Sequence, residues 1–347
     1  MTISEIDLNY IAKESHIDFL SLKNANVFIA GASGFIGKWL LESFFYANEM
    51  YGLNAKVTVL SRDIDFFKIS CPMYFENKNF SVISGDIRNF EWPHAEFTHA
   101  IHAATDVIAT NTPLEIFDVT VLGTKYFLNF CKQAKVHKVL LLSSGAVYGV
   151  IPQNIDRVAE DYSGSPSSAK LNSAYGIGKI ATEWLGTAYS STDLMQCKSA
   201  RIFAQVGPYL ALDKQFAAGN FLLNALRGEE FLIKGDGTPR RSYMYAADLI
   251  IWLWGILNRG ASGQSYNVGS DHGVSILELA KTISMVAKIQ EPKIRVIGVA
   301  NKSGEYERYV PDISKAAKEL NLGIKVTLED ALERTLRWYK AAMKGDK

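Results

Sequence analysis

The sequence has little of what marks secreted or metal-binding proteins. Among its 347 residues there are only three cysteines, Cys71, Cys131 and Cys197, which lie far apart without a CxxC spacing. An odd number of scattered cysteines indicates a reducing compartment and offers no metal-ligand pattern. We therefore expect three buried apolar thiols and no metal site.

An excess of charge of one sign is also missing. Lys and Arg number 37 against 36 Asp and Glu, so the formal net charge is only +1. No global field would draw this chain to nucleic acid or to an anionic membrane, and any anionic ligand must be held by local groups.

Long hydrophobic runs are absent as well. The best membrane candidate, Leu249 to Leu257, is far too short to span a bilayer. The N-terminal residues mix acidic and apolar side chains, unlike the basic-then-apolar order of a signal peptide. These absences predict a cytoplasmic protein without membrane association, and the 48% hydrophobic content is enough for a large core.

What is present is an alternation of short β-branched runs with longer stretches of helical apolar spacing. Such alternation is typical of βαβ units around a parallel sheet. The expected strands are Val27 to Ala30, Lys56 to Leu60, Phe80 to Ser84, Ala100 to Ala103 and Lys138 to Ser143. Pro113 suits a first helical turn, and residues 114–134 are long enough to cross between the last two strands.

Gly and Pro residues that interrupt secondary structure become more frequent after Val150, which indicates shorter elements inserted between later strands. We predict an α/β fold, a doubly wound Rossmann parallel sheet with a smaller mixed α/β substrate-binding lobe. The expected divisions are an amphipathic N-terminal extension (1–24), a dinucleotide-binding domain (25–200, with later contributions from about 240–270) and a mainly substrate-binding lobe (201–347). Two helices are expected near the C-terminus, at 275–288 and 328–343.

A glycine-rich turn follows the first expected strand. Gly31, Gly34 and Gly37 separate that strand from a segment of helical apolar spacing. In this context the first glycine permits a tight turn, the second lets backbone N–H groups approach a pyrophosphate, and the third allows close packing of helix and strand. A tight turn without a ligand is the alternative. We expect dinucleotide binding by Gly31, Ser33, Gly34, Phe35, Ile36 and Gly37.

The end of the second strand indicates which dinucleotide binds. An acidic residue there would bind the ribose 2′-hydroxyl of NAD, but this strand ends in Ser61 and Arg62. The small residue leaves room for a 2′-phosphate, and the guanidinium can bind it in a forked geometry, so NADP(H) is favoured over NAD. Alternatively, Arg62 is a solvated loop cation and Asp63 turns inward. Asp86, after the third strand, is a candidate for the adenine amino group or a turn-forming residue.

Tyr175 and Lys179 lie four residues apart, on one face if the segment is helical. A nearby ammonium and a cationic nicotinamide would favour the tyrosinate, so Tyr175 is expected to exchange a proton near neutral pH. Ser144 ends the fifth strand, where ligands of such sheets bind, and its hydroxyl can contact the reacting oxygen. In the alternative interpretation, Ser144 is a cap and Tyr175 a core aromatic.

Together these motifs resemble the extended short-chain dehydrogenase/reductase family, the NAD-dependent epimerases and dehydratases of nucleotide sugars. The marks of the resemblance are the Gly31 to Gly37 loop, His102-Ala103-Ala104, Ser143 to Gly149, the Tyr175/Lys179 pair, Arg201 to Pro208 and Gly235 to Tyr243. The resemblance implies that Ser144, Tyr175 and Lys179 are catalytic. It also implies that Ile87, Ala103, Ala104 and Thr105 lie beside the cofactor. Arg241, Asn220 and Gln205 would contact the substrate, and Phe231 and Lys234 would line its base pocket.

The family's dehydratases carry an Asp-Glu pair just before Val-Tyr-Gly, where this chain has Gly145-Ala146. Neither residue can move a proton, so 4,6-dehydration is disfavoured. The remaining chemistry needs only hydride transfer and the tyrosine. Because Ser61-Arg62 favours NADPH, we expect a reductase of a nucleotide-linked 4-keto-6-deoxyhexose, with dTDP or CDP as the nucleotide. A 4-epimerase with tightly bound NAD and a non-catalytic NADP-binding regulator remain alternatives. A UDP-glucuronate decarboxylase is a further alternative, but the expected site of this chain contains no distinctive acidic residue that would support it.

Family members often dimerise through the helix that carries the tyrosine and the one before it. Residues 114–134 and 175–189 have enough apolar side chains for such a homodimer. Burial of both helices against the chain's own sheet would give the same pattern.

Overall fold

A parallel sheet of seven strands forms the centre of the protein. The computed structural model describes residues 2–105, 112–192, 195–214, 216–299 and 307–345. The sheet's strands are β1 (Asn26–Ala30), β2 (Lys56–Ser61), β3 (Phe80–Ser84), β4 (His99–His102), β5 (Lys138–Ser144), β6 (Gln196–Ile202) and β10 (Ser265–Val268), in the order β10-β6-β5-β4-β1-β2-β3. The order reverses between β1 and β4, which places the ligand crevice of a doubly wound sheet at their carboxyl ends.

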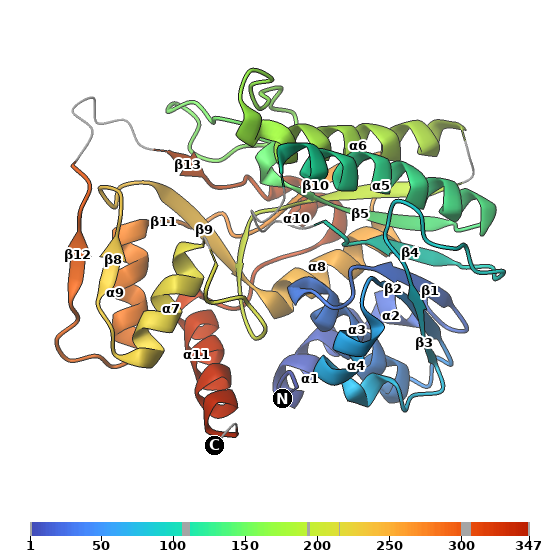
Figure 1. The fold of residues 1–347 in the computed structure, drawn as a ribbon, viewed down its shortest axis with the longest axis horizontal. Helices are drawn as coiled ribbons and strands as arrows, with labels where there is room; N and C mark the ends of the chain where they lie inside the picture. The colour runs from blue at the N-terminus through green and yellow to red at the C-terminus, as the bar shows by residue number, and fades with distance from the viewer. Residues whose placement is uncertain (1, 106–111, 193–194, 215, 300–306, 346–347) are drawn as a thin grey trace.

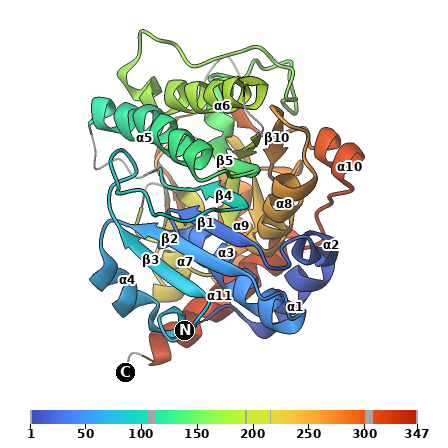
Figure 2. The same ribbon diagram turned by 90° about the vertical axis from the view of Figure 1, so that its right-hand side faces the viewer.

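Helices cover both faces of this sheet, as Figures 1 and 2 show. The elements are α3 (Phe35–Met50), α4 (Ile64–Ser70), η1 (Pro72–Tyr74), α5 (Pro113–Gln133), η2 (Gly145–Tyr148), η3 (Leu171–Ser173), α6 (Ala174–Thr192) and α8 (Ala246–Arg259). Helices α5 and α6 lie side by side on one face, and α3 and α8 lie on the other. Pro113 occupies the first turn of α5, which Thr112 and Glu115 close with a capping box.

The second half of the chain builds a smaller lobe at one end of the sheet (Figure 1). Its elements are β7 (Ala204–Val206), α7 (Ala217–Arg227), β8 (Phe231–Ile233), β9 (Arg240–Tyr245), β11 (Gly273–Ser275), α9 (Ile276–Val286), β12 (Ile294–Val296), β13 (Arg308–Tyr309) and α11 (Leu328–Gly345). Strand β9 lies between β11 and β13 and also pairs with β7. Helix α10 (Ser314–Leu320) packs on α8 and β10. The predicted fold class, a Rossmann sheet with a smaller α/β lobe, is confirmed.

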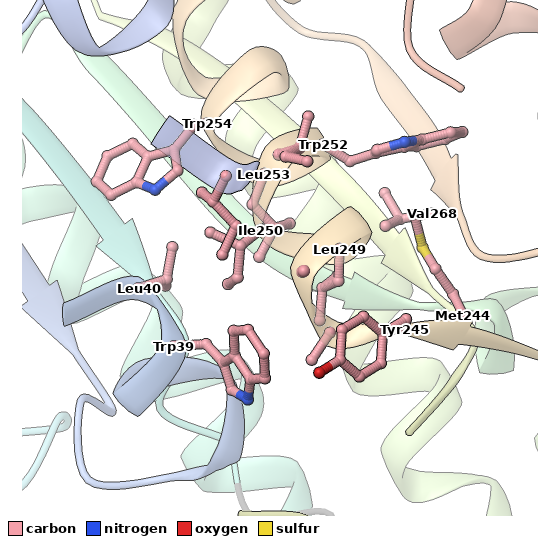
Figure 3. Packing of buried hydrophobic residues seen from close by; sticks show 14 of the residues in the cluster. Trp39, Leu40, Met244, Tyr245, Leu249, Ile250, Trp252, Leu253, Trp254 and Val268 are labelled. Atoms are coloured by element: carbon pink, nitrogen blue, oxygen red, sulfur yellow. The ribbon is translucent and has the colours of Figure 1, made fainter. Parts of the chain in front are cut away.

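Helix α8 is the most deeply buried helix that the structure describes. Every residue from Ala246 to Leu257 is buried. Figure 3 shows Leu249, Ile250, Leu253 and Trp254 of α8 facing Trp39 and Leu40 of α3. A helix that is apolar all round must be enclosed on all sides. This explains the short hydrophobic run at 249–257, and no described helix is long and apolar enough to cross a membrane.

The N-terminal extension forms two helices, α1 (Glu5–Glu14) and α2 (His16–Leu20), which cover the outer side of α8. Asp7 is buried, and its carboxylate accepts hydrogen bonds from the Tyr245 hydroxyl at 2.8 Å and from the Arg334 guanidinium at 2.7 Å. Trp338 also donates its indole N–H to the Thr2 carbonyl at 2.9 Å. The extension therefore joins the Rossmann domain to α11 of the lobe.

Two histidines in β4 are buried without charge. Burial lowers the pKa of His99 to about 4 and that of His102 to about 3. The unfolded chain binds protons at both rings below about pH 6.5, whereas the folded chain does not until far lower pH. Below about pH 6.5 the unfolded state thus holds more protons, and stability falls as the pH falls towards about 4.

We expect the free energy of unfolding to lose up to about 1.4 kcal/mol per pH unit for each histidine across this range. Urea unfolding between neutral pH and about pH 4.5 measures this slope. His99 and His102 together should contribute to the slope of unfolding free energy against pH, and His102→Gln should remove about half of that contribution. His94→Gln, at an exposed position, should leave the slope unchanged. Equal slopes in all three proteins would contradict the assignment.

Candidate active site

The glycine loop lies between β1 and α3, where backbone approaches backbone too closely for any side chain. Gly31 has φ +89°, and a Cβ there would lie 2.5 Å from the Ala103 carbonyl. At Gly37 a Cβ would lie 2.3 Å from the Gly31 carbonyl oxygen. The loop thus brings the ends of β1 and β4 together, including Ala103 and Ala104. Gly34 is the N-cap of α3, and no side chain caps this helix. The N–H groups of its first turn can therefore donate hydrogen bonds to an anion such as a pyrophosphate, so these residues fit the predicted dinucleotide.

The end of β2 offers a hydroxyl and a cation. Ser61 is buried and donates to the Asp63 backbone carbonyl at 2.9 Å. The Asp63 carboxylate accepts from the Phe66 N–H at 2.8 Å and caps α4, so it does not turn inward. Arg62 remains exposed at this edge.

The neighbouring end of β3 carries a paired carboxylate. Asp86 accepts two hydrogen bonds from the Arg88 guanidinium, at 2.7 and 3.0 Å, and this bonding holds the pKa of the Asp86 carboxyl below its usual value. Ile87 is buried against Gly123 of α5. Asp86 thus closes a turn with Arg88, and a contact between its carboxylate and adenine stays a prediction.

The three predicted catalytic residues come from two elements. Ser144 ends β5, and Tyr175 and Lys179 lie one turn apart on α6. The Lys179 ammonium is 5.6 Å from the centroid of the Tyr175 ring, and it donates to Thr105 Oγ1 at 2.9 Å and to the Leu142 carbonyl at 2.6 Å. Thr105 follows β4, so the group sits where the ends of β4 and β5 meet the start of α6.

Burial dominates the protonation of both α6 residues. It lowers the pKa of Lys179 to about 7 and raises that of Tyr175 above its ordinary value, although a hydrogen bond with Ser144 opposes the latter change. Without a bound dinucleotide, burial therefore favours the protonated Tyr175 phenol, and the expected tyrosinate beside a cationic nicotinamide stays a prediction. Desolvation of the phenolate is the largest cause of the raised pKa of Tyr175. A protonated Tyr175 is suited to donating a proton.

The donor count of Lys179 predicts a pH dependence of dinucleotide binding. Its ammonium has three N–H bonds, and Thr105 and Leu142 accept two of them. The third can reach a ligand, but a neutral amine has only two. Since the pKa is about 7, we expect the association constant for the dinucleotide to fall above pH 7, by up to about tenfold per pH unit.

Calorimetric titration across neutral pH measures this fall. A Lys179→Met variant should bind more weakly and show no such pH dependence. A wild-type association constant that stays unchanged from mildly acidic to mildly alkaline pH would contradict the role of the third N–H.

The site contains a second phenol, that of Tyr309, which sequence analysis did not predict. Tyr309 of β13 lies with its hydroxyl 3.5 Å from Ser144 Oγ. A Cβ on Gly145 would lie 2.6 Å from this hydroxyl and 2.7 Å from the Phe203 ring. The Tyr309 phenol thus fills the space beside Ser144 that a side chain at position 145 would need. Burial raises its pKa to about 12.

A buried ion pair between Arg201 and Glu183 lies next to the end of β5 that carries the site. The Arg201 guanidinium donates to both carboxylate oxygens of Glu183, with a shortest distance of 2.8 Å, and to the Tyr148 hydroxyl at 2.8 Å. Ser143 also donates to Glu183, at 2.5 Å. Both side chains of the ion pair are largely buried, so the network fixes α6 against β5 and β6.

The predicted substrate residues lie in different settings. Arg241 lies beside the site: its guanidinium carbon is 5.4 Å from the centroid of the Tyr309 ring, and it pairs with Glu307 at 2.9 Å. Asn220 of α7 and Lys234 after β8 are exposed. Phe231 is buried in the core, with its ring centroid 5.9 Å from that of Phe221. Contacts of these residues with a substrate stay predictions.

The register between β7 and β9 decides which face of the lobe's sheet Gln205 occupies. In β7 it pairs with Met244, whereas Ala204 pairs with Tyr243. Tyr243 shares a face of β9 with Arg241, which is two residues away. Gln205 therefore lies on the opposite face from Arg241, and its buried Oε1 has no hydrogen-bond partner among the described residues.

Comparison with known proteins places this site in a family. A model of the NAD dependent epimerase/dehydratase family matches residues 27–269. The chain belongs to this family. The match begins in β1 and ends just after β10, so it spans the Rossmann sheet and the three predicted catalytic residues.

Named members of the family share about a quarter of their residues with this chain. UDP-glucuronic acid decarboxylase 1 of Danio rerio is 28% identical over 345 residues, covering 97% of this chain and 78% of the relative. UDP-glucuronic acid decarboxylase 6 of Arabidopsis thaliana is 27% identical over 315 residues, covering 89% and 87%.

Solved family structures share the fold. The UDP-glucose 4-epimerase of Thermotoga maritima has a TM-score of 0.76 at 20% identity, covering 92% of this chain and 99% of its own. The dTDP-glucose 4,6-dehydratase of Bacillus anthracis, solved with NAD, also has a TM-score of 0.76 at 20% identity, covering 92% and 98%. Among the described residues of this chain, no three His, Cys, Asp or Glu side chains gather as metal ligands.

Proposed function

We propose that this family member reduces the 4-keto group of a nucleotide-linked 4-keto-6-deoxyhexose with NADPH, in the synthesis of deoxysugars for surface polysaccharides. The observation that carries the proposal is the end of β2. The Asp63 carboxylate caps α4, and we expect the two residues before it, Ser61 and Arg62, to meet the adenosine ribose. This pair favours a 2′-phosphate, and NADPH is the usual reductant of biosynthesis.

In this mechanism each residue acts on the ketone or on the bound dinucleotide. The dinucleotide supplies a hydride to the carbonyl carbon. Tyr175 gives its phenolic proton to the oxygen as the alkoxide forms, and its raised pKa keeps that proton in place beforehand. Ser144 orients the oxygen, while Lys179, anchored on Thr105 and Leu142, holds the ribose hydroxyls.

The surroundings of Gly145 support a reduction without elimination. Removing water from C5 and C6 requires a further acid and base, and Gly145-Ala146 supplies neither. The Tyr309 hydroxyl and the Phe203 ring occupy the space that a longer side chain at position 145 would need. We propose dTDP or CDP as the nucleotide and a cytoplasmic setting, with Arg241 holding the diphosphate.

A decarboxylase of a nucleotide-linked uronate is the second candidate, because the named relatives with 27–28% identity are decarboxylases. A 4-epimerase is the third. Both return the hydride to the sugar and leave the dinucleotide oxidation state unchanged over a cycle, whereas a reductase consumes one NADPH per product. A regulator that binds NADP would consume none.

One assay separates these candidates. Absorbance at 340 nm is followed while the protein and NADPH or NADH meet dTDP- and CDP-linked 4-keto-6-deoxyhexoses. UDP-glucuronate and UDP-glucose are incubated in parallel with chromatography of the products. Stoichiometric loss of NADPH with one ketose supports the reductase. UDP-pentose formation or epimerisation without loss of NADPH would replace it with the second or third candidate.

The same assay tests the cofactor preference. If Arg62 binds the 2′-phosphate, Arg62→Ala should lower kcat/KM for NADPH by about 10- to 100-fold, corresponding to about 1.5–3 kcal/mol, and leave that for NADH unchanged. Equal losses with both dinucleotides would assign Arg62 a structural role.

We also propose a homodimer formed through α5 and α6. Large apolar side chains are exposed on these two adjacent helices: Leu114, Phe117, Leu122, Ile180 and Trp184. Trp184 is 67% exposed, so these helices are not fully buried against the chain's own sheet. Sedimentation of the purified chain as a monomer at micromolar concentration would contradict this proposal.

A further inference from the structure

A cavity of about 460 Å³ lies beside the lobe's three-stranded unit β11-β9-β13. We call it the arginine cavity. It is lined by Asp156, Arg157, Arg240, Asp271, His272, Gly273, Arg308 and Val310. The three arginines come from separate segments: the stretch between η2 and η3, strand β9 and strand β13. Three of the eight lining residues are thus arginines, whose guanidinium groups bind anions.

Strand register places this cavity on the far side from the candidate active site. Arg308 pairs with Arg240, and Tyr309 pairs with Arg241. Because side chains alternate along a strand, Arg240 and Arg308 share one face while Arg241 and Tyr309 share the other. The arginine cavity is thus a second cationic site, separated from the first by a single layer of backbone.

Two of the carboxylates that pair with the arginines of the cavity are exposed enough for a ligand to displace them. Arg308 pairs with Asp156, whose side chain is 86% exposed against 19% for Arg308. Arg240 lies 3.5 Å from Glu278, with exposures of 36% and 53%. In these two pairs the cation is the more buried partner and the carboxylate the more exposed one. The third pair, Arg157 with Asp271 at 2.9 Å, has the opposite order, with Arg157 53% exposed and Asp271 37%.

A network that served stability alone would gain from packing closely. Here the guanidinium groups line open volume, and a partly exposed ion pair such as that of Arg240 with Glu278 contributes little energy that would oppose its exchange. Arg240 is held in place by a bond to the Gly273 carbonyl at 2.6 Å, which orients it without neutralising it. The cavity therefore holds its arginines in place, and without a ligand each of them is paired with a carboxylate.

We propose that the arginine cavity binds the phosphate group of a phosphorylated small molecule, which takes the place of the Asp156 and Glu278 carboxylates. Phosphate offers oxygens in the geometry that two guanidinium forks match. The volume exceeds that of a free phosphate ion and leaves room for a bound sugar. This inference does not depend on the reaction proposed above.

Calorimetry with two probes, inorganic phosphate and a hexose 1-phosphate, tests the proposal on the full chain. The dinucleotide site is first saturated with NADP⁺ so that the glycine loop cannot bind the probes. We expect binding of at least one probe. Tighter binding of the hexose phosphate would assign a contact to the sugar, and equal binding would assign the phosphate alone.

Two variants locate the site, one that removes a positive charge from the arginine cavity and one that removes a negative charge. Arg157→Gln should weaken binding at least fivefold, and Asp156→Asn should strengthen it at least twofold, because it removes a competing carboxylate. Both positions have exposed side chains, so the fold should tolerate the changes. Arg337→Gln, at an exposed arginine of α11, is the matched control and should leave binding unchanged.

Three outcomes would overturn the proposal. One is that neither probe binds the saturated wild-type protein. Another is that Arg157→Gln and Asp156→Asn both bind as the wild type does. The last is that Arg241→Gln abolishes binding while Arg157→Gln does not, since that would move the phosphate to the opposite face of β9.

Discussion

Tyr175→Phe is expected to lower kcat for ketone reduction by about 10³-fold, within the range for loss of a positioned general acid. The substitution removes one oxygen atom and leaves the ring on α6, beside Lys179. Substrate binding depends on other groups, so KM should change only a few-fold. The change in kcat converts to about 4 kcal/mol of transition-state stabilisation. Stopped-flow absorbance at 340 nm under single-turnover conditions measures the step directly.

Tyr309→Phe is the matched control, because both phenols flank Ser144. If Tyr175 is the donor, the Tyr309 variant should lose less than about tenfold in kcat, the scale of a single neutral hydrogen bond. Comparable losses in both variants would mean that the two phenols act together. A Tyr175→Phe protein with full turnover would exclude the proposed mechanism.

Arg334→Met is expected to reduce the free energy of unfolding by about 3 kcal/mol. The Asp7 side chain is 4% exposed, and its ion pair with Arg334 has a distance of 2.7 Å. Methionine fills much of the arginine's volume but leaves a buried carboxylate without its cationic partner, bonded only to the neutral hydroxyls of Tyr245 and Ser4 among the described side chains. Uncompensated buried charge is among the few causes of losses this large. Urea unfolding monitored by tryptophan fluorescence measures the change.

The same helix provides a control. Arg337→Met removes the exposed pair with Glu333 and should cost less than about 0.5 kcal/mol. Adding Asp7→Asn to Arg334→Met removes the orphaned charge and should recover part of the loss. Additive effects of Asp7→Asn and Arg334→Met, without recovery, would show that the ion pair carries no coupling energy.

The features that sequence predicted well are local ones. The glycine loop, the Tyr175/Lys179 pair and the serine at the end of β5 each depend on a few consecutive residues with a known backbone geometry. The βαβ alternation also predicted five of the seven strands of the central sheet to within one residue at their ends, although it did not predict β6 and β10. These signals are strong because period and spacing translate directly into faces of helices and ends of strands.

Tyr309 could not be found in this way. Strand β13 has only two residues, and its pairing with β9 depends on the tertiary structure. A two-residue strand has no hydrophobic period, so nothing in the sequence indicates which of Arg308 and Tyr309 faces Ser144. The rise in the pKa of Tyr175 in the protein without a dinucleotide could not be inferred from the sequence, for a related reason. Pairwise charge can be inferred from spacing, but desolvation depends on everything that surrounds the group.

The extension illustrates the same limit. Its amphipathic pattern indicated packing against the core, but Asp7 resembles any acidic residue in a first helical turn. Only the fold shows that its partners are Tyr245 and Arg334. Likewise, Phe231 is an apolar residue in a short strand, and burial against Phe221 is as consistent with its sequence context as a ligand contact.

The contact between the first and last helices also has a consequence for how the chain folds during synthesis. Asp7 and Arg334 are 327 residues apart, and Trp338 reaches Thr2 over 336. The ribosome therefore releases α1 long before the residues that neutralise Asp7 exist. Until α11 emerges, the nascent Rossmann domain must leave α1 undocked or bury an unpaired carboxylate. Closure of this longest-range contact should be the last step of folding, so chains truncated before α11 should expose α8 to proteases and chaperones.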